Sequence, residues 1–186
     1  MAVKVKLSNV RLSFPTLFTA EQYKGQGAFN YSAKFMVKPG SPNDGLIKDA
    51  ILAVAKEKWP KKVDLMLEEF RMDKKAYPYI DGKRVEFDGA EGMWVLTAKR
   101  KQDAGRPLVV DADKTPLAES DGKPYAGCFV NASVEFWAQD GDTKGIRCSL
   151  IGVQFAKDGE HFGGGARPSE DDFEDISEGA SADDLV

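Results

Sequence analysis

Residues 127–138 read GCFVNASVEFWA, and apolar and polar side chains alternate along the whole stretch. One set comprises Cys128, Val130, Ala132, Val134 and Phe136, and the other comprises Phe129, Asn131, Ser133, Glu135 and Trp137. A period of two residues is typical of a β-strand with one face in a core. The stretch therefore predicts a core strand, and the two large rings among the polar set need a reason other than packing.

Alternation of this kind recurs on both sides of the stretch, in residues 3–14, 29–37, 92–101, 106–113 and 146–155. In the first of these the register changes near Asn9, which predicts a bulge or bend there. After the change, Val10, Leu12 and Phe14 share one face. Five or six strands of this length indicate a small closed or partly closed β-barrel.

The period changes in residues 41–59, which read SPNDGLIKDAILAVAKEKW. Ser41 is suited to cap a helix, Pro42 to its first position, and Asp44 to the positive end of its dipole. The apolar residues that follow recur every three or four positions, and a second, shorter helix is expected after Pro60. The sequence therefore predicts a mainly β protein with a helical insertion at about residues 42–70.

The charge of the chain is divided unevenly. The formal net charge is −4, but residues 169–186 contain eight acids and no Lys or Arg. The preceding residues then hold 26 bases against 22 acids, a net charge of +4. The glycines at 163–165 mark the predicted boundary between a folded body, residues 1–162, and a flexible acidic tail, residues 163–186. A basic body with an acidic tail favours a polyanion as partner, although such tails also serve solubility alone.

Motifs for catalysis are missing from the sequence. His161 is the only histidine, the two cysteines form no CxxC pair, and no glycine-rich stretch has the Lys-Ser/Thr of a phosphate loop. We therefore expect no enzyme activity, no cofactor and no metal. The first residues alternate rather than forming an apolar run, so we also expect no signal peptide, no membrane span and a cytoplasmic location.

Basic and aromatic side chains remain as the candidate binding site. Single-stranded nucleic acid is bound by cations that follow its backbone and rings that stack on its bases. The candidates are Lys34, Lys38, Tyr77, Tyr79, Lys83, Arg84, Trp94, Lys99, Arg100, Lys101, Arg106, Phe129, Trp137 and Arg147. Trp137 is the favoured stacking ring because its neighbours on that face are polar. Trp94 shares a face with Leu96 and Ala98, so stacking and core packing both remain open for it.

The stretch YAGCFVNASVEFWA at 125–138 is followed by KGIRCSLIGVQFAKDGEHFGGGARPSEDDF at 144–173. With VRLSFPTLF at 10–18 and the predicted helical insertion, these stretches resemble a family of bacteriophage single-stranded-DNA-binding proteins of the Enterobacter-phage type. The resemblance covers nearly the whole chain. It implies an oligonucleotide-binding (OB) fold, and sequence-independent binding of single-stranded DNA in phage replication and recombination, in the host cytoplasm. A homo-oligomer is a further possibility.

Proteins of this functional class commonly carry a flexible acidic C-terminus. The resemblance therefore implies a tail that competes with DNA for the basic surface and recruits replication proteins. The candidate partner-binding residues are Asp171, Asp172, Phe173, Glu174, Asp175, Asp183, Asp184, Leu185 and Val186. The alternative is a protein–protein adaptor or assembly factor whose tail is its whole interaction site. The choice between DNA and RNA stays open, because no residue identifies a 2′-hydroxyl contact.

Overall fold

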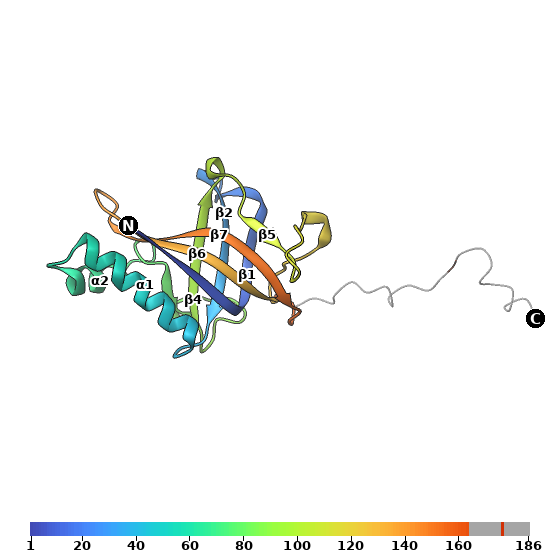
Figure 1. Ribbon diagram of the computed structural model, residues 1–186, viewed down its shortest axis with the longest axis horizontal. Coiled ribbons are helices and arrows are strands. Elements are labelled where there is room, and N and C mark those ends of the chain that lie inside the picture. Colours follow the sequence, from blue (N-terminus) through green and yellow to red (C-terminus); the bar gives the residue numbers. More distant parts are fainter. Residues whose placement is uncertain (164–175, 177–186) are drawn as a thin grey trace, which may run out of the picture.

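The computed structural model describes residues 1–163 and residue 176, and the strands of this part form one continuous sheet (Figure 1). The strands are β1 (Ala2–Tyr23), β2 (Gln26–Val37), β3 (Tyr79–Asp81), β4 (Trp94–Lys101), β5 (Leu108–Val110), β6 (Phe129–Gln139) and β7 (Gly145–Lys157). The helices are α1 (Pro42–Lys58) and α2 (Val63–Arg71), and the 3-10 turns are η1 (Gly82–Arg84), η2 (Gln102–Ala104) and η3 (Glu119–Asp121). Neighbouring strands follow the order β3-β4-β2-β1-β6-β7-β5.

The sheet closes into a barrel because β4 also pairs with β7. The closing contact is the parallel bridge between Lys99 and Ser149, and β5 continues the parallel pairing along β7 from Leu108 opposite Gly152. The barrel strands are therefore β1, β2, β4, β7 and β6, the five-stranded arrangement of an OB-fold. The predicted mainly β barrel is confirmed.

The long strand β1 pairs with two neighbouring strands and bends between the two pairings. Its first part pairs with β6 and its second part with β2. The register with β6 shifts between Leu7 and Val10, and Asn9 lies between them with a φ of 52°. The bulge predicted near Asn9 is confirmed, and it lets one strand follow the curvature of the barrel.

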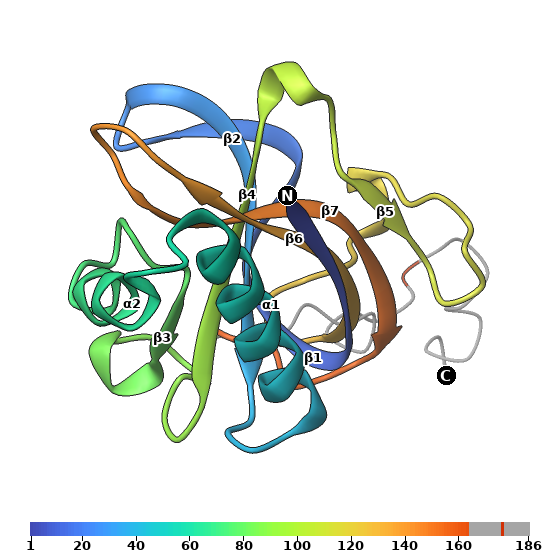
Figure 2. The same ribbon diagram turned by 60° about the vertical axis from the view of Figure 1, so that its left-hand side comes forward.

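The helices of the insertion lie between β2 and β3, as predicted. Ser41 caps α1, because its Oγ accepts a hydrogen bond from the Asp44 amide at 3.3 Å. The helix lies across β1 and β6 and buries Ile47 and Ile51 against the barrel (Figure 2). Neither α1 nor α2, the helices of the described residues, is long and apolar enough to cross a membrane.

A buried carboxylate joins α1 to β3. Asp44 is only 4% exposed, and its side chain accepts hydrogen bonds from the Tyr79 hydroxyl at 2.6 Å, Lys48 Nζ at 2.9 Å and the Gly40 amide at 3.0 Å. Burial alone would raise the pKa of Asp44, but these hydrogen bonds outweigh it and lower the pKa below its ordinary value. Burial first, and then the hydrogen bond to Asp44, raises the pKa of Tyr79 above its ordinary value.

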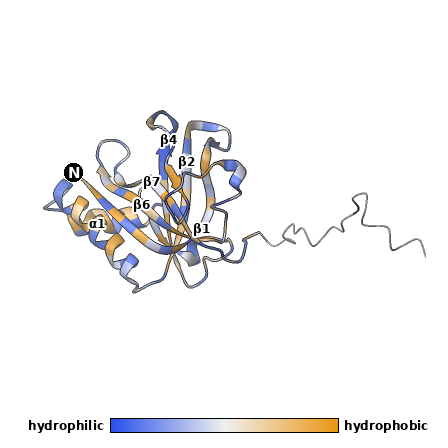
Figure 3. Cartoon of the chain, turned by 45° about the vertical axis from the view of Figure 1, so that its right-hand side comes forward, coloured by the Kyte–Doolittle hydropathy of each residue, from blue (hydrophilic) through white to orange (hydrophobic). Residues whose placement is uncertain are grey.

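Hydrophilic and hydrophobic residues alternate along the strands (Figure 3), and the buried hydrophobic set fills the barrel. Leu12, Phe35 and Phe136 are completely buried in the interior. A smaller apolar cluster lies outside the barrel, against the outer side of β2 and β4. We call it the outer cluster, and it comprises buried Met36, Ala90 and Val95 with partly buried Ile80, Val85, Phe87, Met93 and Phe162.

Residues 158–163 follow β7 and return over β1, and we call them the C-terminal strap. Arg11 of β1 holds the strap, because its Nη2 donates to the Glu160 carbonyl at 2.6 Å and its guanidinium lies 4.1 Å from the centre of the Phe162 ring. The Gly163 amide donates to Asp88 at 3.1 Å. The strap therefore ends beside the outer cluster, to which Phe162 belongs.

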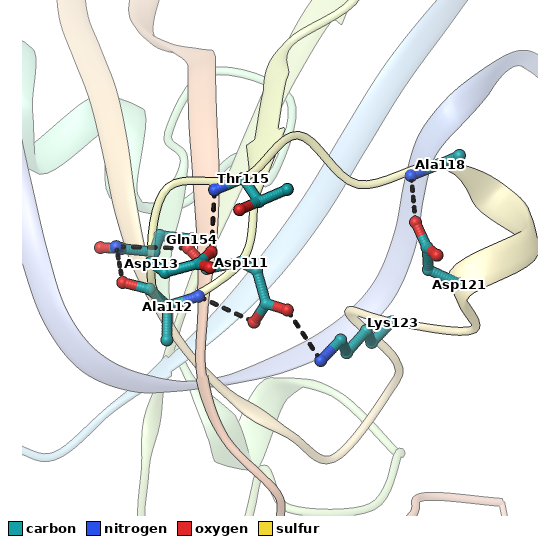
Figure 4. Close-up of polar contacts among 8 residues, drawn as sticks. All are labelled: Asp111, Ala112, Asp113, Thr115, Ala118, Asp121, Lys123 and Gln154. Carbon is teal, nitrogen blue, oxygen red and sulfur yellow. Dashed lines mark hydrogen bonds and ion pairs between the residues drawn. The ribbon is translucent and has the colours of Figure 1, made fainter.

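In the loop between β5 and β6, carboxylates bind to groups of the same loop and so stabilise its turns (Figure 4). Asp111 pairs with Lys123 at 2.9 Å, and this bond lowers the pKa of Asp111. Asp113 accepts from the Thr115 amide at 2.9 Å, and Asp121 accepts from the Ala118 amide at 2.7 Å. These carboxylates have structural partners, in keeping with the role of such side chains in turns.

Candidate nucleic-acid interface

Polar and basic side chains line the outer face of β2 and β4, next to the outer cluster. Lys34 lies opposite Thr97 and Ser32 lies opposite Lys99, and we call these four residues the β2–β4 strip. Lys34 Nζ donates to Thr97 Oγ1 at 3.0 Å. The strip faces outward because its residues alternate along the strands with buried core residues such as Ala33 and Phe35.

The charge of the strip is not neutralised within the described part of the chain. Burial first, and then the charges of Lys99 and Lys74, lower the pKa of Lys34 below its ordinary value. The ion pairs found among residues 1–163 involve other cations: the N-terminus, Lys48, Lys123 and Lys144. A group of cations without an ion-pair partner among the described residues favours a bound polyanion.

The outward row continues from β4 across the closing bridge onto β7 and β6. Lys99 is paired with Ser149, and Trp137 Nε1 donates to Ser149 Oγ at 3.0 Å. Trp137 points outward, since Phe136 beside it is fully buried, and its ring is half-buried. Only β7 thus separates this ring on β6 from Lys99 of the β2–β4 strip.

Arg147 lies opposite Trp137, but its guanidinium already has protein partners. It donates to Gln139 Oε1 at 3.2 Å, to the Thr143 carbonyl at 2.9 Å and to the Lys75 carbonyl at 3.0 Å. Burial lowers the pKa of Arg147. These bonds fix the turn between β6 and β7, so Arg147 shapes the edge of the face.

Two loops continue the basic and aromatic surface beyond the barrel. At the end of β4, Arg100 donates to the carbonyls of Ala104 and Gly105, both at 2.8 Å, and so closes the η2 turn, while Lys101 and Arg106 are exposed. Among the exposed residues of the β1–β2 hairpin are two aromatic rings and a lysine. They are Tyr23, which is 76% exposed, Phe29, which is 46% exposed, and Lys24, whose Nζ lies 5.3 Å from the Tyr23 ring centre.

The family is decided by comparison with known proteins. A family model described as "Enterobacter phage Enc34, ssDNA-binding protein" matches residues 3–186. This chain belongs to that family. The resemblance recognised in the sequence is therefore confirmed.

Two relatives of this Enc34-type chain have high coverage. "Putative protein p50" of Acyrthosiphon pisum secondary endosymbiont phage 1 is 43% identical in an alignment of 178 residues that covers 94% of this chain and 95% of that protein. The single-stranded DNA-binding protein from bacteriophage Enc34, solved in complex with ssDNA, is 27% identical with a TM-score of 0.60, covering 86% of this chain and 89% of that one.

A more distant structural neighbour shows the fold alone. It is gp2.5, a single-stranded DNA binding protein encoded by bacteriophage T7, which is 16% identical with a TM-score of 0.54. The superposition covers 97% of both chains. The barrel with its helical insertion is thus shared well beyond the range of close sequence similarity.

Three of the predicted rings lie away from the β2–β4 strip of this Enc34-type barrel. Tyr77 and Tyr79 are 6% and 1% exposed, so neither offers a ring face to a base. Trp94 is half-buried and packs on Tyr79, with ring centres 5.2 Å apart, at a cleft between the helices and β4. These rings are covered because α1 and α2 pack over this end of the barrel.

The remaining predicted residues lie at the borders. Lys83 and Arg84 are exposed in η1, where Lys74 Nζ donates to the Arg84 carbonyl at 2.6 Å, so they adjoin the cations around Lys34. Lys38 is exposed beyond the end of β2. Phe129 lies opposite Arg11, at the other end of β6 from Trp137.

The predicted tail residues from Asp171 to Asp175 and from Asp183 to Val186 lie outside the described residues. Among those described, no group of three or more His, Cys, Asp or Glu side chains is placed to hold a metal ion. Burial raises the pKa of Cys128 to about 11 and also raises the pKa of Cys148, which leaves both thiols protonated at neutral pH.

Sequence reasoning missed four residues of the basic and aromatic surface: Phe14, Tyr23, Lys24 and Lys74. Phe14 is 55% exposed and its ring centre lies 5.1 Å from that of Phe87 in the outer cluster. The YKG sequence at 23–25 is a turn signal with a ring and a cation beside it, and it could have located the hairpin. Nothing local distinguishes Lys74 from the other lysines that follow α2.

Proposed function

We propose that this chain binds single-stranded DNA without sequence preference, in phage DNA replication and recombination, in the cytoplasm of the host cell. The observation that supports this most is the group of Lys34, Lys74 and Lys99 beside the outer side of β2 and β4, for which the described residues provide no ion-pair partner. These two strands take the positions of the second and third OB strands, whose outer face is the usual oligonucleotide site.

The side chains on the outer face of β2, β4 and β6 favour DNA binding that does not depend on the base sequence. Cations attract any phosphate backbone, and a ring such as Trp137 can stack on any base. We propose binding rather than catalysis as the activity, because the buried thiols and the single histidine offer no activated nucleophile. His161 instead stacks on Tyr125, with ring centres 5.2 Å apart.

The acidic tail is proposed to compete with DNA and to recruit replication proteins. The strap supports this because Gly163 is held at Asp88, beside the outer cluster. Met36 of that cluster lies two residues from Lys34 on the same face of β2. Asp171 lies eight residues beyond Gly163, and eight residues of extended chain span at most about 29 Å, so the first acids of the tail are tethered within about that distance of Gly163.

Single-stranded DNA should bind more tightly than duplex DNA of the same length. If about four to six phosphates are neutralised, the logarithm of the association constant should fall with the logarithm of salt concentration at a slope of roughly −3 to −4. Fluorescence anisotropy with labelled oligo-dT, duplex DNA and RNA over a salt series measures this. Equal affinity for single strand and duplex, or no salt dependence, would contradict the proposal and favour an adaptor.

Truncation after Arg167 should raise the affinity for oligo-dT at low salt and leave the melting temperature unchanged. The cut removes eight carboxylates that compete for the same cations. A tethered competitor acts at an effective concentration in the millimolar range, so the gain should be about two- to tenfold and should shrink as salt screens the charges. A full-length chain with the eight acids changed to Asn or Gln is the matched control. Unchanged affinity in both variants would exclude the competing tail.

A further inference from the structure

Phe14 combines three properties that core or rim residues seldom share. Its φ is 45°, in the left-handed region that a bulky side chain rarely adopts. It is 55% exposed, although it lies within β1. It lies in the irregularity where Ser13 still pairs with Lys34 and Thr16 with Ser32, so that the bulge turns the ring out of the barrel.

The contact of the ring places it on the outer face, and its neighbour in the sequence is paired with a strand residue that carries a cation. Its contact with Phe87 brings it against the outer cluster, which covers the neighbouring part of β2 and β4. The two ring planes are 85° apart, and in such an edge-to-face pair at least one face of the Phe14 ring is left uncovered by Phe87. Ser13 next to it is the register partner of Lys34.

We infer that Phe14 forms a subsite for one unstacked nucleobase, and that this subsite makes the protein prefer single strands; the inference rests on the proposed function. A glycine would adopt this backbone conformation without strain, so the strained position retains a side chain that contributes little to the core. Lys34 is placed to hold the phosphate while Phe14 stacks on the base. A duplex keeps its bases paired and stacked, so it can use the lysines but not the ring.

The decisive variant is Phe14→Gly, because a structural role and a binding role predict opposite results. Removing the ring and the strain together should leave the melting temperature nearly unchanged. The affinity for oligo-dT should fall roughly 5- to 150-fold, the range for losing one stacked base. The affinity for duplex DNA should stay the same, so the preference for single strands should fall by that factor. Leu65→Ala, a change at a residue of α2 that is 62% exposed, is the control for loss of exposed apolar surface.

Two further measurements keep the test decisive if Phe14→Gly folds poorly. Phe14→Leu keeps the bulk but has no aromatic face, and it should lose affinity for oligo-dT at unchanged stability. Oligonucleotides that contain 5-iodouracil should crosslink to Phe14 in the wild-type protein. Wild-type affinity in both variants, or a crosslink only elsewhere, overturns the subsite and leaves DNA binding intact. A wild-type protein that binds no single-stranded DNA overturns the proposed function itself.

Discussion

Asp44→Ala should lower the free energy of unfolding by about 2–4 kcal/mol. The change leaves the buried Tyr79 hydroxyl without its acceptor, at a cost of about 1–3 kcal/mol, whereas water can replace the acceptor of the exposed Gly40 amide. It also removes a charge that favours the first turn of α1, worth about 0.3–1 kcal/mol. Urea unfolding at neutral pH measures the loss. Tyr79→Phe is the matched control and should lose less, because Asp44 keeps Lys48 and Gly40 as donors.

This contribution should depend on pH in a defined direction. The pKa of Asp44 is lower in the folded protein than in the unfolded chain, so its stabilisation is present above pH ~4, the ordinary range for an aspartate. The stabilisation is lost as the pH falls below that value, through the folded pKa. The difference between wild type and Asp44→Ala should therefore narrow in acid. A difference that stays constant from pH 7 to about pH 2 would contradict this assignment.

Lys34→Met combined with Lys99→Met should weaken binding to oligo-dT by on the order of 200-fold in about 20 mM salt and 25-fold in about 100 mM salt. Each lost phosphate contact reduces the salt slope by about 0.7 for a single strand, so the slope should become shallower by about 1.4. The affinity for duplex DNA should fall as well, because these residues hold phosphates. Anisotropy titrations at several salt concentrations measure both values.

The fold should tolerate this double substitution. Burial and two neighbouring cations lower the pKa of Lys34, so its charge opposes folding at neutral pH and its removal should maintain or raise the melting temperature. Lys61→Met with Lys62→Met is the control, since it makes the same change of charge at exposed residues between the helices. If the control weakens binding equally, net charge rather than the β2–β4 strip determines affinity.

The sequence predicts the barrel well because the alternation of apolar and polar residues identifies the core face of each strand. β6 begins two residues into the predicted stretch, and Cys128, Val130 and Phe136 are completely buried. The same alternation places Lys34 and Trp137 on the outer face. It cannot predict what covers an element, and so it leaves Tyr79 as a candidate ring, although Asp44, 35 residues earlier, meets its hydroxyl inside the protein.

Phe14 shows that alternation can also predict a buried side chain where the structure has an exposed one. Alternation assigns it to the face of Val10 and Leu12, which are buried, but its positive φ turns the side chain outward. Phe29 likewise shares the parity of the core residue Phe35 and is exposed because β2 extends past the barrel. A departure from regular strand geometry, or the length of a strand beyond the core, is not encoded in the hydrophobic pattern.

The C-terminal strap joins the tail to the barrel, so any contact between the tail and the β2–β4 strip is an intramolecular event. Because Arg11 and Asp88 hold the chain up to Gly163, the acids beyond it start from a fixed point on the barrel. If the tail competes with DNA as proposed, dilution of the protein leaves this internal equilibrium unchanged, whereas displacement of the tail depends on the concentration of DNA. Release of the tail would then report how much single strand is exposed, and not how much of the protein has been made.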